Sequence, residues 1–137
     1  MNIFVAYESR GGKTKKAAEI VADSLRRKGN EVSVSPISEA ATSEVQKAEL
    51  VILGSWVEGF ILFGVGPAKA AIRWAEGLPM LDKKSVAVFC TYGFNPKNSA
   101  EVLASILKTK GAKVLTTQTM RRSDITKAAE DFAQSLS

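Results

Sequence analysis

The sequence predicts an α/β fold, a three-layer sandwich in which helices cover both faces of a five-stranded parallel sheet of order 2-1-3-4-5. Apolar runs with the composition of strands alternate with segments of helical periodicity along the whole chain. Several of these runs are continuously apolar, which is typical of strands buried on both faces. No linker or internal repeat divides the 137 residues, so residues 1–137 are expected to form one domain.

Five short runs rich in β-branched and aromatic residues are predicted to be strands. They are residues 3–7, 31–35, 50–53, 86–90 and 113–117. The segments between them predict helices at residues 14–28, 67–74, 98–110 and 124–136, and a weak helical turn at 43–47. A long glycine-rich loop is expected after residue 53. Because parallel strands are joined by right-handed helical crossovers, the alternation favours the doubly wound strand order.

The composition excludes several classes of function. With 45% hydrophobic and 24% charged residues, the chain is globular rather than disordered. Cys90 is the only cysteine, so no intrachain disulfide can form and a reducing compartment is expected. The chain has no histidine, which excludes Ser-His-Asp triads and histidine-ligated zinc. Any chemistry is therefore expected to be carried by a cofactor or by the backbone.

Nineteen Lys and Arg against 14 Asp and Glu give a net charge of +5, which favours anionic partners. The bases are spread along the chain without a run of five like charges or interleaved aromatics, so specific nucleic-acid binding is not expected. The longest apolar stretch, residues 50–65, contains Glu58 and is shorter than the ~20 residues that a membrane span needs. With no signal peptide visible, the sequence predicts a cytoplasmic protein without a membrane span.

Seven of the ten glycines fall in the loops after predicted strands 1, 3 and 4. They are Gly11, Gly12, Gly54, Gly59, Gly64, Gly66 and Gly93. In doubly wound sheets, ligands bind outside the carboxyl ends of the strands, where the strand order reverses. Turns attract glycine by themselves, but the opposite edge of the sheet is poorer in glycine outside its helix caps. The distribution therefore predicts a binding site at this edge.

The loop after the first strand, residues 8–14, reads ESRGGKT and leads into a helix. Its glycines allow backbone N–H groups to turn toward an anion, and a helix N-terminus favours negative charge. Residues 12–14 look like the end of a nucleotide-binding P-loop, but Tyr7 stands where that motif has its first glycine. Predicted strands 3 and 4 also lack a terminal Asp to hold magnesium. These departures argue against an NTPase and favour phosphate binding of another kind.

The chain resembles the short-chain flavodoxin family along its whole length. The family's first loop follows Ser/Thr-x-Thr-Gly-x-Thr, which this chain matches at Ser9, Gly12 and Thr14 and departs from at Gly11 and Lys13. Residues 53–59 (LGSWVEG) and 89–95 (FCTYGFN) resemble the loops that enclose the flavin ring. The resemblance implies a flavodoxin-like fold and an FMN cofactor, whose phosphate is held by the loop after strand 1 and whose isoalloxazine ring lies between the loops after strands 3 and 4. The cofactor-binding residues that it implies are Ser9, Arg10, Gly11, Gly12, Lys13, Thr14, Ser55, Trp56, Val57, Glu58, Gly59, Thr91, Tyr92, Gly93 and Phe94.

Flat aromatic side chains are the natural walls for an isoalloxazine ring. Trp56 lies two residues nearer its strand than the family's usual stacking position, where this chain has Glu58. Tyr92 and Phe94 are therefore the preferred walls, and packing beneath the loop is the alternative role for Trp56. By the resemblance, Gly59 permits the peptide flip that donates a hydrogen bond to the reduced flavin; the alternative is a plain turn glycine.

Two features depart from the family. Flavodoxins are usually acidic, whereas this chain carries +5. Coulomb's law then predicts a less reducing flavin potential and acidic redox partners. The segment from Phe60 to Val65 is apolar where the family is commonly polar, so it is a candidate for docking a redox partner, forming a homodimer or admitting a quinone or other apolar small molecule. Packing onto the protein's own core is the alternative, and Cys90 is expected to be inert packing.

Three functions remain open on the sequence alone. The leading one is an FMN-binding electron-transfer protein, in which the flavin does the chemistry. The second is an FMN-dependent quinone or small-molecule reductase, for which residues 60–65 are the only sign of a substrate pocket. The third is a flavin-free interaction module with the same fold, suggested by Gly11, Lys13 and the displaced Trp56. A phosphoacceptor receiver domain is disfavoured because Gly54 and Ser55 stand where its carboxylate is required.

Overall fold

The central sheet of the computed structural model, which describes residues 1–60 and 63–136, contains five parallel strands in the order β2-β1-β3-β5-β6. The strands are β1 (Asn2–Glu8), β2 (Glu31–Pro36), β3 (Leu50–Phe60), β5 (Ser85–Tyr92) and β6 (Lys113–Arg121). Because β5 and β6 are the fourth and fifth predicted strands, the predicted order 2-1-3-4-5 is confirmed. All the neighbouring pairs along this order are parallel.

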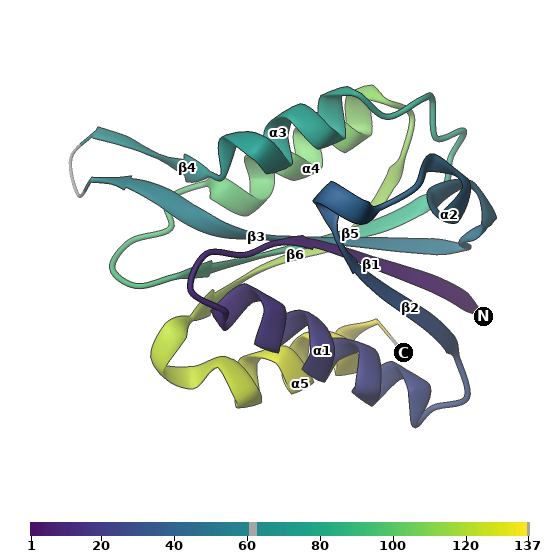
Figure 1. The fold of residues 1–137 in the computed structure, drawn as a ribbon, viewed down its shortest axis with the longest axis horizontal. Coiled ribbons are helices and arrows are strands. Elements are labelled where there is room, and N and C mark those ends of the chain that lie inside the picture. Colours follow the sequence, from purple (N-terminus) through teal and green to yellow (C-terminus); the bar gives the residue numbers. More distant parts are fainter. Residues whose placement is uncertain (61–62, 137) are drawn as a thin grey trace.

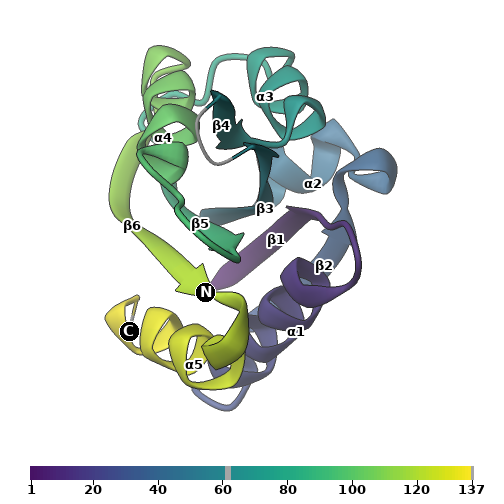
Figure 2. The same cartoon turned by 90° about the vertical axis from the view of Figure 1, so that its left-hand side faces the viewer.

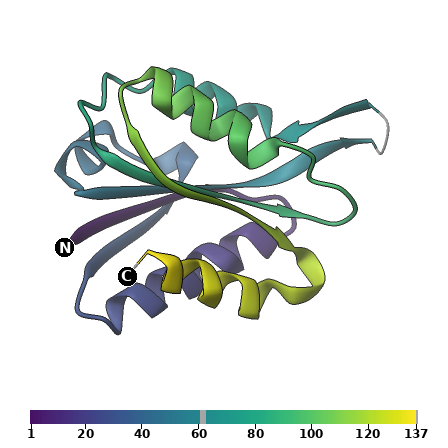
Figure 3. The same cartoon turned by 180° about the vertical axis from the view of Figure 1, so that it is seen from behind.

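Helices cover both faces of the sheet, as Figures 1 and 3 show from opposite sides. One face carries α1 (Lys13–Arg26) and α5 (Ile125–Ser135), and the other carries α2 (Thr42–Lys47), α3 (Lys69–Glu76) and α4 (Ser99–Thr109). Two short 3₁₀ turns complete the chain, η1 (Ile37–Glu39) and η2 (Arg122–Asp124). No helix within residues 1–60 or 63–136 combines the length and apolarity needed to cross a bilayer.

The sheet separates two hydrophobic cores, and β1 contributes to both. Side chains alternate between the faces of a strand. Accordingly, Phe4 and Ala6 pack in the core beneath α3 and α4, whereas Ile3 and Val5 pack in the core beneath α1 and α5. Both cores bury β1 almost completely. The continuous apolar run at residues 3–7 thus has the burial on two faces that its composition predicted.

The segment after the third strand corrects the predicted glycine-rich loop. Instead, β3 continues to Phe60, and a sixth strand, β4 (Phe63–Pro67), turns back along it in antiparallel pairing. Figures 1 and 2 show this hairpin projecting from the sheet edge beside α4. Pro67 ends β4 rather than opening a helix, and α3 begins at Lys69. Residues 61–62, at the centre of the apolar segment considered for docking or dimerisation, lie outside the described part of the chain.

The hairpin forms because the residues after Gly54 also favour strands. Trp56 and Val57 have side chains that suit a pleated surface, and glycine can occupy the irregular positions. Gly59 has a φ of 108° and lies at a register shift between Glu58 and Phe60. A Cβ at Gly59 would also overlap the carbonyl of Gly64 across the hairpin. Both the backbone conformation and the close approach therefore require glycine there.

Gly54 is required for a different reason, a close contact inside the core. A Cβ on this residue would overlap the ring of Phe89 on the neighbouring strand β5. The Phe89 ring cannot easily withdraw, because it packs edge-on against Phe132 of α5 with ring centroids 5.5 Å apart. The pair fills the space between the sheet and α5 that a side chain at Gly54 would need.

Replacing Gly54 with alanine is expected to lower the free energy of unfolding by about 1–3 kcal/mol, the usual cost of overpacking a dense core. Urea denaturation of the purified variants measures the change. Gly66→Ala is the matched control, because no atom outside its chain neighbours lies within 4 Å of the added Cβ. Equal stability of the two variants would contradict the close packing of Phe89 against Gly54.

Candidate cofactor-binding site

Two adjoining pockets lie at the edge where β1, β3 and β5 have their carboxyl ends. The first has a volume of about 300 Å³ and is lined by Val57, Gly59, Val65, Tyr92, Gly93, Phe94, Asn95 and Arg122. The second, of about 670 Å³, is lined by Arg10, Trp56, Val57, Glu58, Gly59, Gly64, Lys69 and Arg122. Val57, Gly59 and Arg122 line both, so the two pockets form one groove. Its position is the one that the strand order predicts for a ligand.

The loop between β1 and α1 leaves the N-terminus of α1 exposed to solvent. Gly11 and Gly12 have φ values of 81° and 95°, in the left-handed region that favours glycine. Gly12 is the N-cap of α1, and no side chain caps the helix there. Within the described residues, the backbone N–H groups of Gly11 and Gly12 donate to no protein acceptor. Donors that the protein leaves unpaired at a helix N-terminus are well suited to an anion such as a phosphate.

The side chain of Ser9 links this loop to the first turn of α1. Its hydroxyl oxygen accepts a hydrogen bond of 3.2 Å from the backbone N–H of Lys15, in the first turn of α1. Arg10 and Lys13 are exposed at the same loop. Of the cofactor-binding residues 9–14 predicted in this loop, residues 9–13 therefore lie at or beside the open helix end, and Thr14 does not.

Thr14 and Thr91 instead face each other in the interior. Both are fully buried, and their Oγ1 atoms lie 2.7 Å apart, with either hydroxyl able to donate. Thr14 belongs to the first turn of α1, and Thr91 lies near the end of β5. This hydrogen bond ties the two loops of the groove to each other. In this structure, both threonines connect elements beneath the groove rather than lining it.

Ser55 has a comparable role at the base of the hairpin. Its buried hydroxyl donates to the carbonyl of Trp56 (2.8 Å) and accepts from the backbone N–H of Ala68 (3.0 Å). The same N–H also reaches the Trp56 carbonyl at 3.2 Å. These bonds connect β3 with the residue preceding α3, so Ser55 sets where the hairpin leaves the sheet.

Three aromatic side chains line the groove. Trp56 lines the larger pocket while also packing against the core, and the guanidinium carbon of Arg10 lies 5.3 Å from its ring centroid. Tyr92 lines the smaller pocket with the guanidinium of Arg121 5.3 Å from its ring centroid. Phe94, next along the β5 loop, is 68% exposed. The aromatic residues predicted as ring walls thus lie along one groove, and Trp56 both lines this groove and packs against the core.

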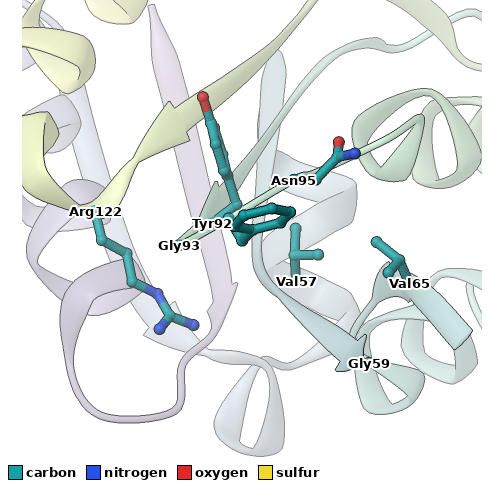
Figure 4. A pocket seen from close by; sticks show the side chains of 8 residues that line it. Val57, Gly59, Val65, Tyr92, Gly93, Asn95 and Arg122 are labelled. Atoms are coloured by element: carbon teal, nitrogen blue, oxygen red, sulfur yellow. The ribbon is translucent and has the colours of Figure 1, made fainter. Parts of the chain in front are cut away.

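Arg122, Lys69 and Asn95 line the groove but were not predicted from the sequence, whereas Val65, which also lines it, belongs to the apolar segment singled out as a candidate contact. Arg122 begins η2, directly after β6, and Figure 4 shows it across the pocket from Val65. A Cβ at Gly93 would lie 3.5 Å from an Arg122 guanidinium nitrogen, so the arginine lies close beside the β5 loop. The available signal was its position between the last predicted strand, residues 113–117, and the last predicted helix, because all parallel strands end at the same edge of the sheet.

Cys90 lies beneath the groove but is not reactive. It is fully buried in the core, and burial, together with the charge of Glu101, raises the pKa of its thiol to about 12. The sulfur therefore stays protonated at neutral pH, and a protonated thiol is a poor nucleophile. The described residues also contain no cluster of three or more His, Cys, Asp or Glu side chains that could hold a metal ion.

Comparison with models of known protein families shows which family the chain belongs to. A family model for the flavodoxin domain matches residues 4–120. The chain belongs to the flavodoxin domain family. Membership implies FMN as the cofactor and electron transport as the activity, in agreement with the resemblance drawn from the sequence.

Solved flavodoxins show the same fold. One from the domain Archaea is 20% identical with a TM-score of 0.76, and covers 98% of this chain and 97% of its own. A short-chain flavodoxin associated with a bacterial microcompartment is 18% identical with a TM-score of 0.80, covering 99% and 96%. The rubredoxin oxygen:oxidoreductase of Desulfovibrio gigas is 22% identical with a TM-score of 0.72; the match covers 98% of this chain but 36% of that larger protein. A comparison with curated protein sequences found no match.

The Thr14–Thr91 pair leads to a test of how the flavodoxin groove is held together. Thr14→Val or Thr91→Val leaves the other hydroxyl buried without its partner, which is expected to cost about 1–3 kcal/mol of unfolding free energy. The double variant leaves neither hydroxyl unpaired, so its cost should fall short of the sum by about 0.5–3 kcal/mol. Thr126→Val, at an exposed position of α5, is the control and should change stability little. Strictly additive urea-denaturation energies would contradict the coupling.

Proposed function

We propose that this flavodoxin domain binds FMN in the groove at the ends of β1, β3 and β5 and acts as an electron carrier. The observation that carries the proposal is the open glycine loop before α1, whose Gly11 and Gly12 N–H groups have no protein acceptor among the described residues. When bound, FMN supplies the redox chemistry by accepting and releasing electrons. The protein's part is to hold the cofactor, wall its ring and set the charge around it.

The phosphate of FMN fits the loop before α1. The positive end of the α1 macrodipole and the free N–H groups favour a negative group there. The exposed side chains of Arg10 and Lys13 add positive charge at the same place. The family's motif has a hydroxyl at the position of Gly11, so the backbone carries a larger share of the binding in this chain.

The isoalloxazine ring fits the aromatic part of the groove. Tyr92 and Phe94 border the smaller pocket, while Trp56 borders the larger one. Both volumes, about 300 and about 670 Å³, lie within the range of about 300–1,000 Å³ usual for ligand sites. An arginine guanidinium lies over one face of the Trp56 ring and another over one face of the Tyr92 ring. Flat aromatic faces that stack on guanidinium groups are equally suited to stack on an aromatic ring such as isoalloxazine.

One observation favours a second function, an FMN-dependent reductase of quinones or other small molecules. The groove consists of two pockets rather than one, and the larger is bordered by Trp56 and Val57 as well as by polar groups. If the cofactor ring occupies the smaller pocket, the larger one leaves room for a flat apolar substrate beside it. The carrier remains the first choice, because the flavodoxin family supports it directly.

Phosphate recognition is tested by comparing FMN with riboflavin, which lacks the phosphate. The apo protein, titrated while flavin fluorescence is followed, should bind FMN at least about ten-fold more tightly, the equivalent of one charge-assisted hydrogen bond. Gly12→Ala should reduce this ratio, because alanine disfavours the φ of 95° that directs the loop.

The matched control is Gly29→Ala at the other end of α1. Gly29 has a φ of 92° and equally open surroundings, so its substitution strains the backbone in the same way away from the groove. Its ratio of FMN to riboflavin affinity should stay unchanged. A wild-type protein that ignores micromolar FMN would overturn the proposal and favour the flavin-free interaction module.

Steady-state assays separate the carrier from the reductase. The FMN-loaded protein is mixed with NADPH and a soluble benzoquinone, and the loss of NADPH absorbance is followed. A carrier should show negligible turnover until a separate flavodoxin reductase is added, because it receives its electrons from a protein partner. Rapid turnover by the protein alone, lowered by Trp56→Ala at the larger pocket, would establish the reductase instead.

A further inference from the structure

The mouth of the groove carries a cluster of positive charge. Arg10, Lys69 and Arg122 all line the larger pocket, although they come from three separate segments: the loop after β1, the start of α3 and the turn after β6. Glu58 is the one carboxylate among the described residues that line either pocket. Arg121 adds a further cation over Tyr92. We call Arg10, Lys69 and Arg122 the basic rim.

The protein does not neutralise the basic rim. The ion pairs found in residues 1–60 and 63–136 are Arg26–Asp23 on α1 and Lys127–Asp131 on α5, both away from the groove. Arg10, Lys69 and Arg122 are exposed, and their side chains form no hydrogen bond or ion pair with any described residue. The phosphate of bound FMN would offset part of the charge of Arg10, whereas Lys69 and Arg122 are neither buried nor paired and keep their field in the solvent, where it acts on approaching molecules.

An exposed aromatic side chain lies beside the basic rim. Phe94 lines the smaller pocket, which shares Arg122 with the larger one, and is 68% exposed. The other exposed large hydrophobic side chains in the described part of the chain are Met1, Met80 and Leu115, none of which lines the groove. Exposed aromatic residues and arginines, such as Phe94 and Arg122 in this pocket, are the residue types that protein interfaces favour over the rest of the surface.

We propose that the basic rim and Phe94 form a docking surface for an acidic redox protein. The inference rests on the proposed function, because the groove mouth is where a partner would approach the bound FMN. Positive charge at the site, together with a net charge of +5 for the whole chain, attracts a partner with acidic residues around its own redox centre. Phe94 would provide the apolar contact at the centre, and the rim would orient the partner.

Calorimetric titration with an acidic plant-type ferredoxin tests the proposal directly. The FMN-loaded protein should bind ferredoxin in low salt, and the dissociation constant should rise at least about ten-fold between 0.01 M and 0.15 M salt, as the Debye length falls from about 30 Å to about 8 Å. Cytochrome c, a basic protein, should bind more weakly than ferredoxin in low salt. An affinity for ferredoxin that is independent of salt, or tighter binding of cytochrome c, would overturn the proposal.

Reversing the charge of one residue distinguishes the effect of the basic rim on ferredoxin binding from the effect of the protein's net charge. Lys69→Glu and Lys113→Glu change the total charge equally, but Lys113 is exposed at the amino end of β6, on the opposite edge of the sheet. In low salt, Lys69→Glu should weaken ferredoxin binding at least about three-fold more than Lys113→Glu. Equal effects of the two variants would show that only the net charge matters and would refute a local docking surface.

The titration is repeated on the apo protein, and FMN affinity is measured separately for each variant. If FMN does not bind at all, the proposed function fails, while the salt dependence and the Lys69 comparison in the apo protein still decide on docking. If FMN binds normally and Lys69→Glu has no more effect than its control, docking fails and the cofactor proposal stands.

Discussion

The burial of the parallel sheet on both faces is the constraint on which the rest of this structure depends. Backbone groups inside the sheet are paired between strands, and the apolar side chains of β1, β3 and β5 alternate between two separate cores. Only helical crossovers can cover both faces while keeping the strands parallel. The strands must then all end at one edge, which brings together segments that are far apart in the sequence. The groove is a consequence of this packing.

Buried hydroxyl groups convert that shared edge into a defined shape. Thr14 and Thr91 join the start of α1 to the end of β5, and Ser55 joins β3 to the residue before α3. A buried polar group is costly unless it is paired, so each of these bonds favours one relative position of its two segments. The exposed donors, those of Gly11 and Gly12, remain for a ligand. The buried hydroxyl groups thus hold the loops in place, while the exposed backbone N–H groups are the ones available to bind a ligand.

Positive charge gathers at the groove of this chain. Arg10, Lys69 and Arg122 converge on the groove from three segments, and Glu58 is the carboxylate among the described residues that faces them. Under the two proposals, this arrangement would have two effects: it would attract the phosphate of FMN toward the loop before α1, and it would present a positive surface to a protein that approaches the cofactor. The same charges favour the added negative charge of a reduced flavin, which is the physical basis for expecting a less reducing potential.

The sequence by itself determined the fold class, the strand order and the family resemblance, because the continuous apolar runs at residues 3–7 and 50–53 and the glycines of the first loop are local signals. It missed the β3–β4 hairpin, since glycines at 54, 59, 64 and 66 are as typical of a loop as of a hairpin with a bulge at Gly59. Only the tertiary structure showed that Thr14 faces Thr91, 77 positions away, and that Arg122 lines the groove beside Lys69. Local signals depend on residues that are near one another in the chain. These contacts instead join segments that crossover helices bring together at one edge of the sheet, and no local pattern in the sequence shows which distant residues will meet there.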